Sequence, residues 1–201
     1  MQNIFLSKDK PEDYVDKNGV GKYPDAPGKC PFGDCGVNLQ MKKNGFYIRL
    51  LITITFAGLI RIRRYKCPKC GRTLSMLPSF CIAGFTYSID IVVAILQYVI
   101  NKGSIKKTVR EWRAIAVEVS RRLISKYLAR LRNNRGMIQY GINQLSPDNI
   151  GLGRLSGDTE WTKSFLGGIR PNLSPEFNAD FHKITGKSFM SLHNRIAQPV
   201  R

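Results

Sequence analysis

Four of the five cysteines in this 201-residue chain form two close pairs. Four residues separate Cys30 from Cys35, two separate Cys67 from Cys70, and 31 residues lie between the pairs. In each pair proline follows the first cysteine and glycine follows the second, which favours a sharply bent backbone. Two such turns can surround one tetrahedral metal ion with four thiolates, as in structural zinc sites.

Disulfide or redox chemistry is the alternative for these cysteines. The first sixteen residues contain six charged side chains, so they do not look like a secretory signal. We therefore expect a cytoplasmic protein, and in that reducing compartment paired cysteines more often bind metal than form structural disulfides. The sequence around the cysteines shows no βαβ pattern, so a thioredoxin-like redox site is not favoured. The spacing predicts a zinc ribbon with Zn²⁺ bound by Cys30, Cys35, Cys67 and Cys70, whereas Cys81 is expected to be a small buried side chain.

The formal charge of +18 predicts a polyanionic partner, with nucleic acid favoured over an anionic membrane surface. Residues 36–89 contain nine Lys and Arg and no Asp or Glu. Residues 102–135 contain eleven basic and two acidic residues, but residues 147–201 contain seven and five. The longest apolar run, residues 50–60, is too short to span a bilayer. A nucleic-acid surface is therefore expected in the first three quarters of the chain.

Between the cysteine pairs the sequence predicts a β-hairpin. Alternation over residues 46–55 favours a strand that buries Phe46, Ile48, Leu50, Ile52 and Ile54. Residues 56–58 are expected to form the turn, and residues 59–66 the return strand. A basic face on this hairpin could follow phosphates, although a solvated face is the simpler alternative. The candidate DNA contacts are Arg61, Arg63, Arg64 and Lys66.

Helical patterns follow the second cysteine pair. Residues 87–103 repeat apolar side chains at helical spacing, which predicts a core helix. Residues 104–132 predict two shorter helices with a break near 117–120. The pattern Ala114-x3-Glu118-Val119-Ser120-x3-Ile124 resembles the bacterial helix-turn-helix, whose second helix lies in the major groove. The resemblance implies that Val119, Ile124, Tyr127 and Leu128 face the core, whereas Ser120, Arg121, Arg122, Ser125 and Lys126 face DNA. A basic helix pair with a solvated face is the alternative.

A wider resemblance covers residues 28–135, and its most specific part is the run from Tyr65 to Phe80, YKCPKCGRTLSMLPSF. The order of parts resembles that of zinc-ribbon proteins of unassigned function that accompany bacterial insertion sequences. These parts are a cysteine pair, a basic hairpin, this run and a helical region. They are also similar to the zinc-ribbon N-terminal regions of transposases. The resemblance implies recognition of double-stranded DNA, and it suggests a separately encoded transposase subunit as a second partner.

The last quarter of the chain offers no visible catalytic site. Strand transfer would need three carboxylates on an RNase H-like domain, and the few acidic residues after position 135 lie in Gly- and Pro-rich sequence. We expect the α+β class, with a zinc ribbon followed by a helix-turn-helix-like region. The predicted parts are an N-terminal arm (1–29), the ribbon (30–81), the helical region (82–135) and a weakly structured tail (136–201). Within the tail a short helix is expected near residues 175–184, and the remainder is expected to be a linker or docking segment.

The expected function is non-catalytic DNA binding linked to a mobile element, by a cytoplasmic, nucleoid-associated protein. It would act as a transposase accessory or as the recognition part of a split or truncated transposase. No membrane contact and no small-molecule substrate are expected. Two alternatives stay open, namely an RNA-binding or ribosome-associated ribbon and a zinc-stabilised protein–protein adaptor. A nuclease built around Asp158 is the least favoured possibility.

Overall fold

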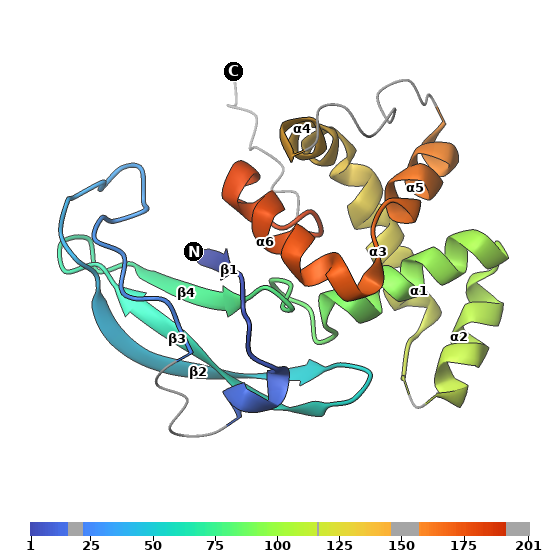
Figure 1. Ribbon diagram of the computed structural model, residues 1–201, viewed down its shortest axis with the longest axis horizontal. Coiled ribbons are helices and arrows are strands. Elements are labelled where there is room, and N and C mark those ends of the chain that lie inside the picture. The colour runs from blue at the N-terminus through green and yellow to red at the C-terminus, as the bar shows by residue number, and fades with distance from the viewer. Residues whose placement is uncertain (16–21, 116, 146–156, 192–201) are drawn as a thin grey trace, which may run out of the picture. The chain divides into compact units, whose positions relative to one another are not determined.

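A computed structural model describes residues 1–15, 22–115, 117–145 and 157–191 (Figure 1). The chain divides into two compact units, unit 1 (Met1–Ile89) and unit 2 (Asp90–Arg201). Unit 1 contains a four-stranded sheet, and the α-helices belong to unit 2 apart from the first residue of α1. The predicted α+β class is confirmed. Unit 1 contains the predicted arm and ribbon and the first residues of the predicted helical region. Unit 2 contains the remainder of that region and the tail.

The sheet of unit 1 has the order β1-β4-β3-β2. Strand β1 pairs in parallel with β4, and the other neighbours are antiparallel. The β2–β3 hairpin was predicted, but its turn lies earlier than expected, because β3 already begins at Ala57. Thr53 Oγ1 accepts the N–H groups of Thr55 and Phe56 within this turn. The strands are β1 (Gln2–Phe5), β2 (Lys42–Ile52), β3 (Ala57–Lys66) and β4 (Thr73–Pro78).

The predicted buried face of β2 is wrong. Ile48 and Leu50 are 59% and 47% exposed, whereas Leu51 on the opposite face is fully buried. Strand β4 pairs with β3 only at residues 64–66, so the far half of the hairpin has no third strand beside it. The buried face instead packs beneath the 79–88 segment, to which Arg49 is tied by hydrogen bonds to the carbonyls of Ile82 and Phe85.

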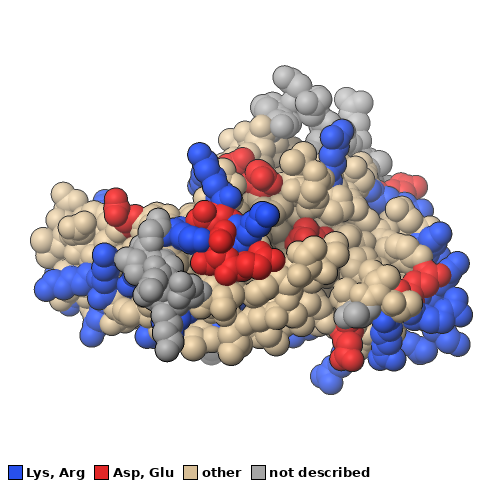
Figure 2. Space-filling view, turned by 60° about the horizontal axis from the view of Figure 1, so that its bottom comes forward, with Lys and Arg blue, Asp and Glu red and all other residues tan. Residues whose placement is uncertain are grey.

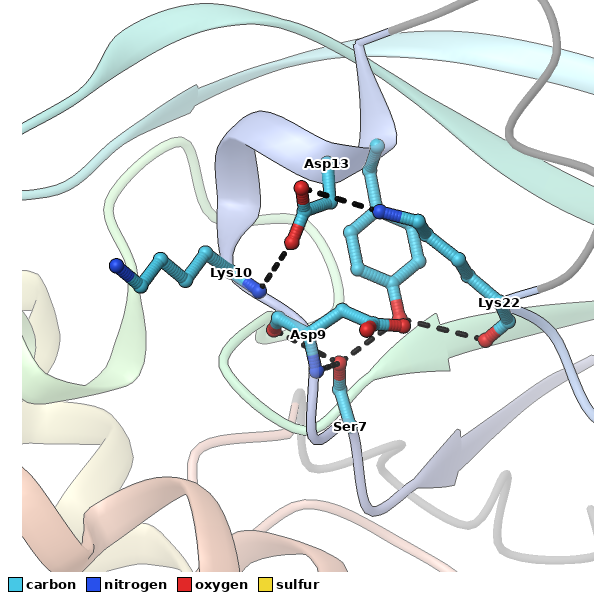
Figure 3. Close-up of polar contacts among 6 residues, drawn as sticks. Ser7, Asp9, Lys10, Asp13 and Lys22 are labelled. Atoms are coloured by element: carbon cyan, nitrogen blue, oxygen red, sulfur yellow. Dashed lines mark hydrogen bonds and ion pairs between the residues drawn. The ribbon is translucent and has the colours of Figure 1, made fainter.

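The described part of the N-terminal segment, residues 1–15 and 22–29, packs on unit 1, which corrects there the loose arm expected over residues 1–29. Strand β1 extends the sheet, and a 3₁₀ turn (η1, Pro11–Tyr14) follows it. Figure 3 shows the polar contacts around this turn, where Asp13 pairs with Lys22 at 3.1 Å. The Tyr14 hydroxyl lies 2.8 Å from Ser7 Oγ and donates to the Lys22 carbonyl. Tyr14 is 2% exposed, and burial raises the pKa of its phenol to about 12.

Unit 2 is a bundle of helices in which the predicted core helix is confirmed. Helix α1 ends before Gly103, whose φ of +65° is the left-handed conformation expected after a helix. The predicted break after the second helix is also present, since α2 ends at Ala114 and α3 begins at Arg121. The bounds are α1 (Ile89–Lys102), α2 (Ile105–Ala114), α3 (Arg121–Asn133), α4 (Arg135–Leu145), α5 (Asp158–Gly167) and α6 (Ser174–Thr185), with a 3₁₀ turn η3 (Pro171–Leu173) before α6.

The predicted weakly structured tail is wrong for the described part of residues 136–201. Helices α4, α5 and α6 lie there, and their aromatic side chains form much of the core of unit 2. Phe165 stacks on Trp161 at 5.4 Å between ring centroids and meets Phe189 edge-on at 5.8 Å. The Asn134 amide, 1% exposed, donates to the carbonyls of Phe189 and Ser191 at 2.8 Å each. The segment therefore completes a core and does not act as a linker.

Helices α4 and α6 approach closely at a glycine, which gives a first test of this packing. A Cβ added to Gly141 would lie 2.3 Å from the ring of Phe181, which is fully buried. Gly141→Ala is therefore expected to lower the free energy of unfolding by about 1–3 kcal/mol, measured by thermal or urea melting. Gly136→Ala in the same helix meets nothing within 4 Å, so this control is expected to stabilise by about 0.5–1 kcal/mol. Equal effects of the two changes would contradict the packing.

Candidate metal centre and basic surfaces

Two hydrogen-bonded turns present the paired cysteines. In the first, Phe32 O accepts the N–H groups of Cys35 and Gly36 at 2.9 and 2.8 Å. In the second, which joins β3 to β4, Cys67 O accepts from Gly71 at 3.0 Å. Gly36 and Gly71 have φ values of +47° and +70°, so each cysteine pair is followed by a left-handed residue that favours glycine. The glycine that follows each cysteine pair in the sequence is therefore the residue whose backbone conformation completes the turn.

The four sulfur atoms of Cys30, Cys35, Cys67 and Cys70 all lie within 4.8 Å of one another. The Sγ atoms of Cys30 and Cys70 are 3.8 Å apart, and those of Cys35 and Cys67 are 3.9 Å apart. Thiolates at about 2.3 Å from a tetrahedral ion are separated by about 3.8 Å, whereas a disulfide needs about 2.05 Å. The arrangement can hold one metal ion. Among the described residues it is the one such group of three or more potential ligands.

The surroundings of the site combine an apolar base with an arginine that hydrogen-bonds to one of the sulfurs. Cys30 and Cys67 are buried on a cluster that includes Met41, Leu74 and Met76. Burial raises the pKa of the Cys30 thiol to about 12. At the exposed side, hydrogen bonding from Arg72 lowers the pKa of the Cys70 thiol to about 6.

The Arg72 guanidinium is held in place from two directions. It lies 2.5 Å from an Asp34 carboxylate oxygen and 4.2 Å from the centroid of the Phe32 ring. Because Phe32 and Asp34 belong to the first cysteine turn and Arg72 follows the second, these contacts join the two turns. The lone Cys81 is fully buried outside the four-sulfur group, in line with its expected role as a small core side chain.

The basic residues of the hairpin are not equally accessible. Arg63 is 7% exposed, with its guanidinium 3.8 Å from the centroid of the Phe46 ring, which contradicts its predicted place on an outward basic face. Arg61 and Arg64 are partly buried, and Arg64 donates to the Phe46 carbonyl at 3.4 Å. Lys66 is exposed. Strand alternation missed this because the N-terminal segment and Phe46 cover part of the face.

Lys66 lies beside lysines that the sequence reasoning did not single out. A hollow of about 450 Å³ adjoins the second cysteine turn, and its cationic lining is Lys42, Lys66 and Lys69. Lys42 and Lys66 are register partners at the start of β2 and the end of β3. The signal was present in the sequence, since a lysine stands on each side of Cys67-Pro68. We call this feature the knuckle hollow.

Helix α3 separates its side chains as the sequence predicted. Val119, Ile124, Tyr127 and Leu128 are all buried. Ser120 is the N-cap, and its hydroxyl accepts the Leu123 N–H at 3.1 Å. The five candidate DNA contacts Ser120, Arg121, Arg122, Ser125 and Lys126 are all exposed. Position 116, inside the turn between α2 and α3, lies outside the described residues.

Asp158, the carboxylate around which a nuclease was considered, has a structural partner. Asp158 lies in the first turn of α5 and pairs with Arg135 at 2.9 Å. A carboxylate at that position is favourable for the helix dipole.

None of the described helices has the length and apolar character needed to cross a bilayer.

Comparison with protein-family models, with curated protein sequences and with solved structures finds no match to this chain. The candidate sites are therefore assigned from their own geometry and chemistry.

Proposed function

We propose that this protein is a non-catalytic DNA-binding protein stabilised by structural zinc. It is linked to a mobile element, as a transposase accessory or as the DNA-recognition part of a split or truncated transposase. The proposal places it in the cytoplasm, associated with the nucleoid. Its partners are double-stranded DNA and a separately encoded transposase subunit, and the mobile-element link rests on the sequence resemblance over residues 28–135.

Zinc is the metal best suited to the four-sulfur site. Tetrahedral thiolate sets bind zinc or iron–sulfur centres, and Zn²⁺ needs no inorganic sulfide and no redox partner. Four protein ligands leave no open position for a substrate or a catalytic water. The metal would therefore hold the two turns together, and the basic side chains around them would contact the DNA.

The observation that carries DNA binding is the division of α3 into a buried apolar face and an exposed face of Ser120, Arg121, Arg122, Ser125 and Lys126. A serine-capped basic helix that exposes hydroxyl and guanidinium groups offers hydrogen-bond donors for base edges and phosphates. The knuckle hollow adds a second lysine-rich surface in unit 1. An extended polyanion such as DNA is long enough to contact basic residues of both units.

A titration of the zinc-loaded protein tests this function. We expect tighter binding to duplex DNA than to duplex RNA of the same sequence, with log K falling linearly against log salt. Arg121→Ala with Arg122→Ala is expected to weaken binding and to reduce that slope by at least about 0.9, since each phosphate contact contributes about 0.9. Equal affinity for both nucleic acids would favour the RNA-binding alternative. Absence of binding to either at low salt would overturn the proposal.

The adaptor function has one observation in its favour. Ile48, Leu50 and Leu59 are 59%, 47% and 57% exposed on one face of the hairpin, where Leu50 and Leu59 are register partners. An adaptor that used this face would lose its protein partner on Leu50→Asp with Leu59→Asp. It would keep that partner on Arg121→Ala with Arg122→Ala, which separates the two functions.

A further inference from the structure

A second basic hollow lies in unit 2, and the sequence reasoning assigned no role to most of its lining. Its volume is about 600 Å³, and it is formed by α2 together with the start of α3. In the space-filling view, Lys and Arg side chains gather at the right, the side on which Figure 1 draws α2 (Figure 2). The polar residues that line the hollow are Ser104, Lys106, Lys107, Arg110, Arg113 and Arg121.

Charge within this hollow is poorly compensated. Lys107 pairs with Glu111 at 3.9 Å, which is a long contact between half-exposed side chains. No described carboxylate forms an ion pair with Lys106, Arg110 or Arg113. All three are exposed. Like charges that share a concave surface raise its positive potential and attract anions.

The two helices that form the hollow reinforce this potential. Neither α2 nor α3 carries an acidic residue in its first turn, although a helix start favours negative charge. Lysines occupy the first turn of α2 and arginines that of α3. An anion in the hollow would compensate both the side chains and the positive ends of the two helix dipoles.

The spacing along α2 indicates what kind of anion fits. Lys106, Arg110 and Arg113 follow one another at intervals of four and three residues, so they form a stripe along one face of the helix. That stripe is about 10 Å long at 1.5 Å per residue. The phosphates of one DNA strand recur every 3.4 Å or so along the duplex axis, so a strand can present several to the stripe. Arginine forks bind phosphate oxygens in pairs.

We propose that this hollow seats successive phosphates of one DNA strand. Arg110 and Arg113 hold the backbone, and Arg121 joins them from the start of α3. The site rests on the proposed DNA-binding function and extends it. It assigns backbone contact to α2 and leaves the outer face of α3, from Arg122 to Lys126, for the groove.

The test compares two double variants of the full-length, zinc-loaded protein. Arg110→Ala with Arg113→Ala removes two cations from the hollow. Lys163→Ala with Arg170→Ala removes two exposed cations of the same unit outside it. Binding of each protein to two unrelated duplexes is measured by fluorescence anisotropy over a series of salt concentrations. Circular dichroism of each variant checks that the helices are retained.

The hollow variant is expected to reduce the salt slope by about 1.8 and to weaken binding on the order of tenfold or more at 0.1 M salt. The loss should be equal for both duplexes, because phosphates carry no sequence information. The control should retain nearly the wild-type slope. Equal losses in the two variants would overturn the site, as would a change in sequence preference at constant slope.

A small-anion measurement separates failure of the site from failure of the function. Inorganic tripolyphosphate carries adjacent phosphates without a nucleic acid, and it should raise the melting temperature of unit 2 in the wild type more than in the Arg110, Arg113 variant, which keeps the knuckle hollow of unit 1. If tripolyphosphate stabilises the wild type but the protein binds no DNA, the hollow is an anion site. Its assignment to a DNA strand is then wrong. If neither ligand is bound, both the function and the site are wrong.

Discussion

Replacing Cys67 with serine is expected to release the metal ion and to unfold unit 1. Cys67 is fully buried, and its sulfur is 3.9 Å from that of Cys35, so a hydroxyl there leaves a buried site with one ligand missing. Structural zinc contributes about 10–16 kcal/mol of apparent binding energy, which is as large as the whole stability of most domains. Even a loss of 3 kcal/mol would lower the melting temperature of a domain of this size by roughly 12–24 °C.

Metal content by mass spectrometry and a thermal melt measure this effect. Wild-type protein should carry one zinc per chain, and the variant should carry substantially less. Cys81→Ala is the matched control, because Cys81 is as buried as Cys67 but lies outside the four-sulfur group. It should keep its zinc and lose about 1 kcal/mol. A Cys67→Ser protein that melts like the wild type would show that unit 1 does not depend on the metal.

Truncating Phe165 to alanine is expected to destabilise unit 2 by about 3–5 kcal/mol. The ring is 1% exposed and contacts Trp161, Phe177 and Phe189, so its removal leaves a cavity bounded by three elements. Urea unfolding followed by tryptophan fluorescence would report it, since Trp161 stacks directly on this ring. The effect belongs to a segment whose sequence suggested weak structure, which makes the measurement informative.

Tyr140→Ala provides the comparison for that result. Tyr140 lies on α4 in the same unit but is 57% exposed, so its loss should cost less than about 0.5 kcal/mol. If the two aromatic residues prove equally dispensable, the aromatic core is not formed in solution. If Phe165→Ala also removes DNA binding at temperatures where its helices are intact, the role of α5 goes beyond packing.

The metal site was predictable because its information is local. Proline and glycine at fixed positions around each cysteine pair specify two turns, and the chemistry of four thiolates then requires the turns to meet. The start of α3 was predictable for a similar reason, since Ser120 supplies an N-cap directly before a periodic apolar pattern. In both cases a few neighbouring residues determine the backbone.

The buried face of the hairpin was not predictable from alternation alone. Apolar residues occur on both faces of β2, as Leu50 and Leu51 show, and only the rest of the fold decides which face is covered. Arg63 illustrates the same limit, because it is covered by the Phe46 ring, which in turn contacts Tyr23 of the distant N-terminal segment. In the last part of the chain a short helix was predicted near residues 175–184, where α6 lies, but α4 and α5 were not predicted. Gly and Pro residues in that part obscured the helical spacing of the aromatic pair Trp161 and Phe165.

The parallel pairing of β1 with β4 also constrains how the chain reaches its native state. Residues Gln2 to Phe5 lie beside Ser75 to Pro78, so β1 has no strand partner until about seventy residues that follow it have been synthesised. The β2–β3 hairpin can form earlier, because its contacts are close in sequence. Unit 1 therefore assembles from its middle outward, and its N-terminal strand is among the last to be placed.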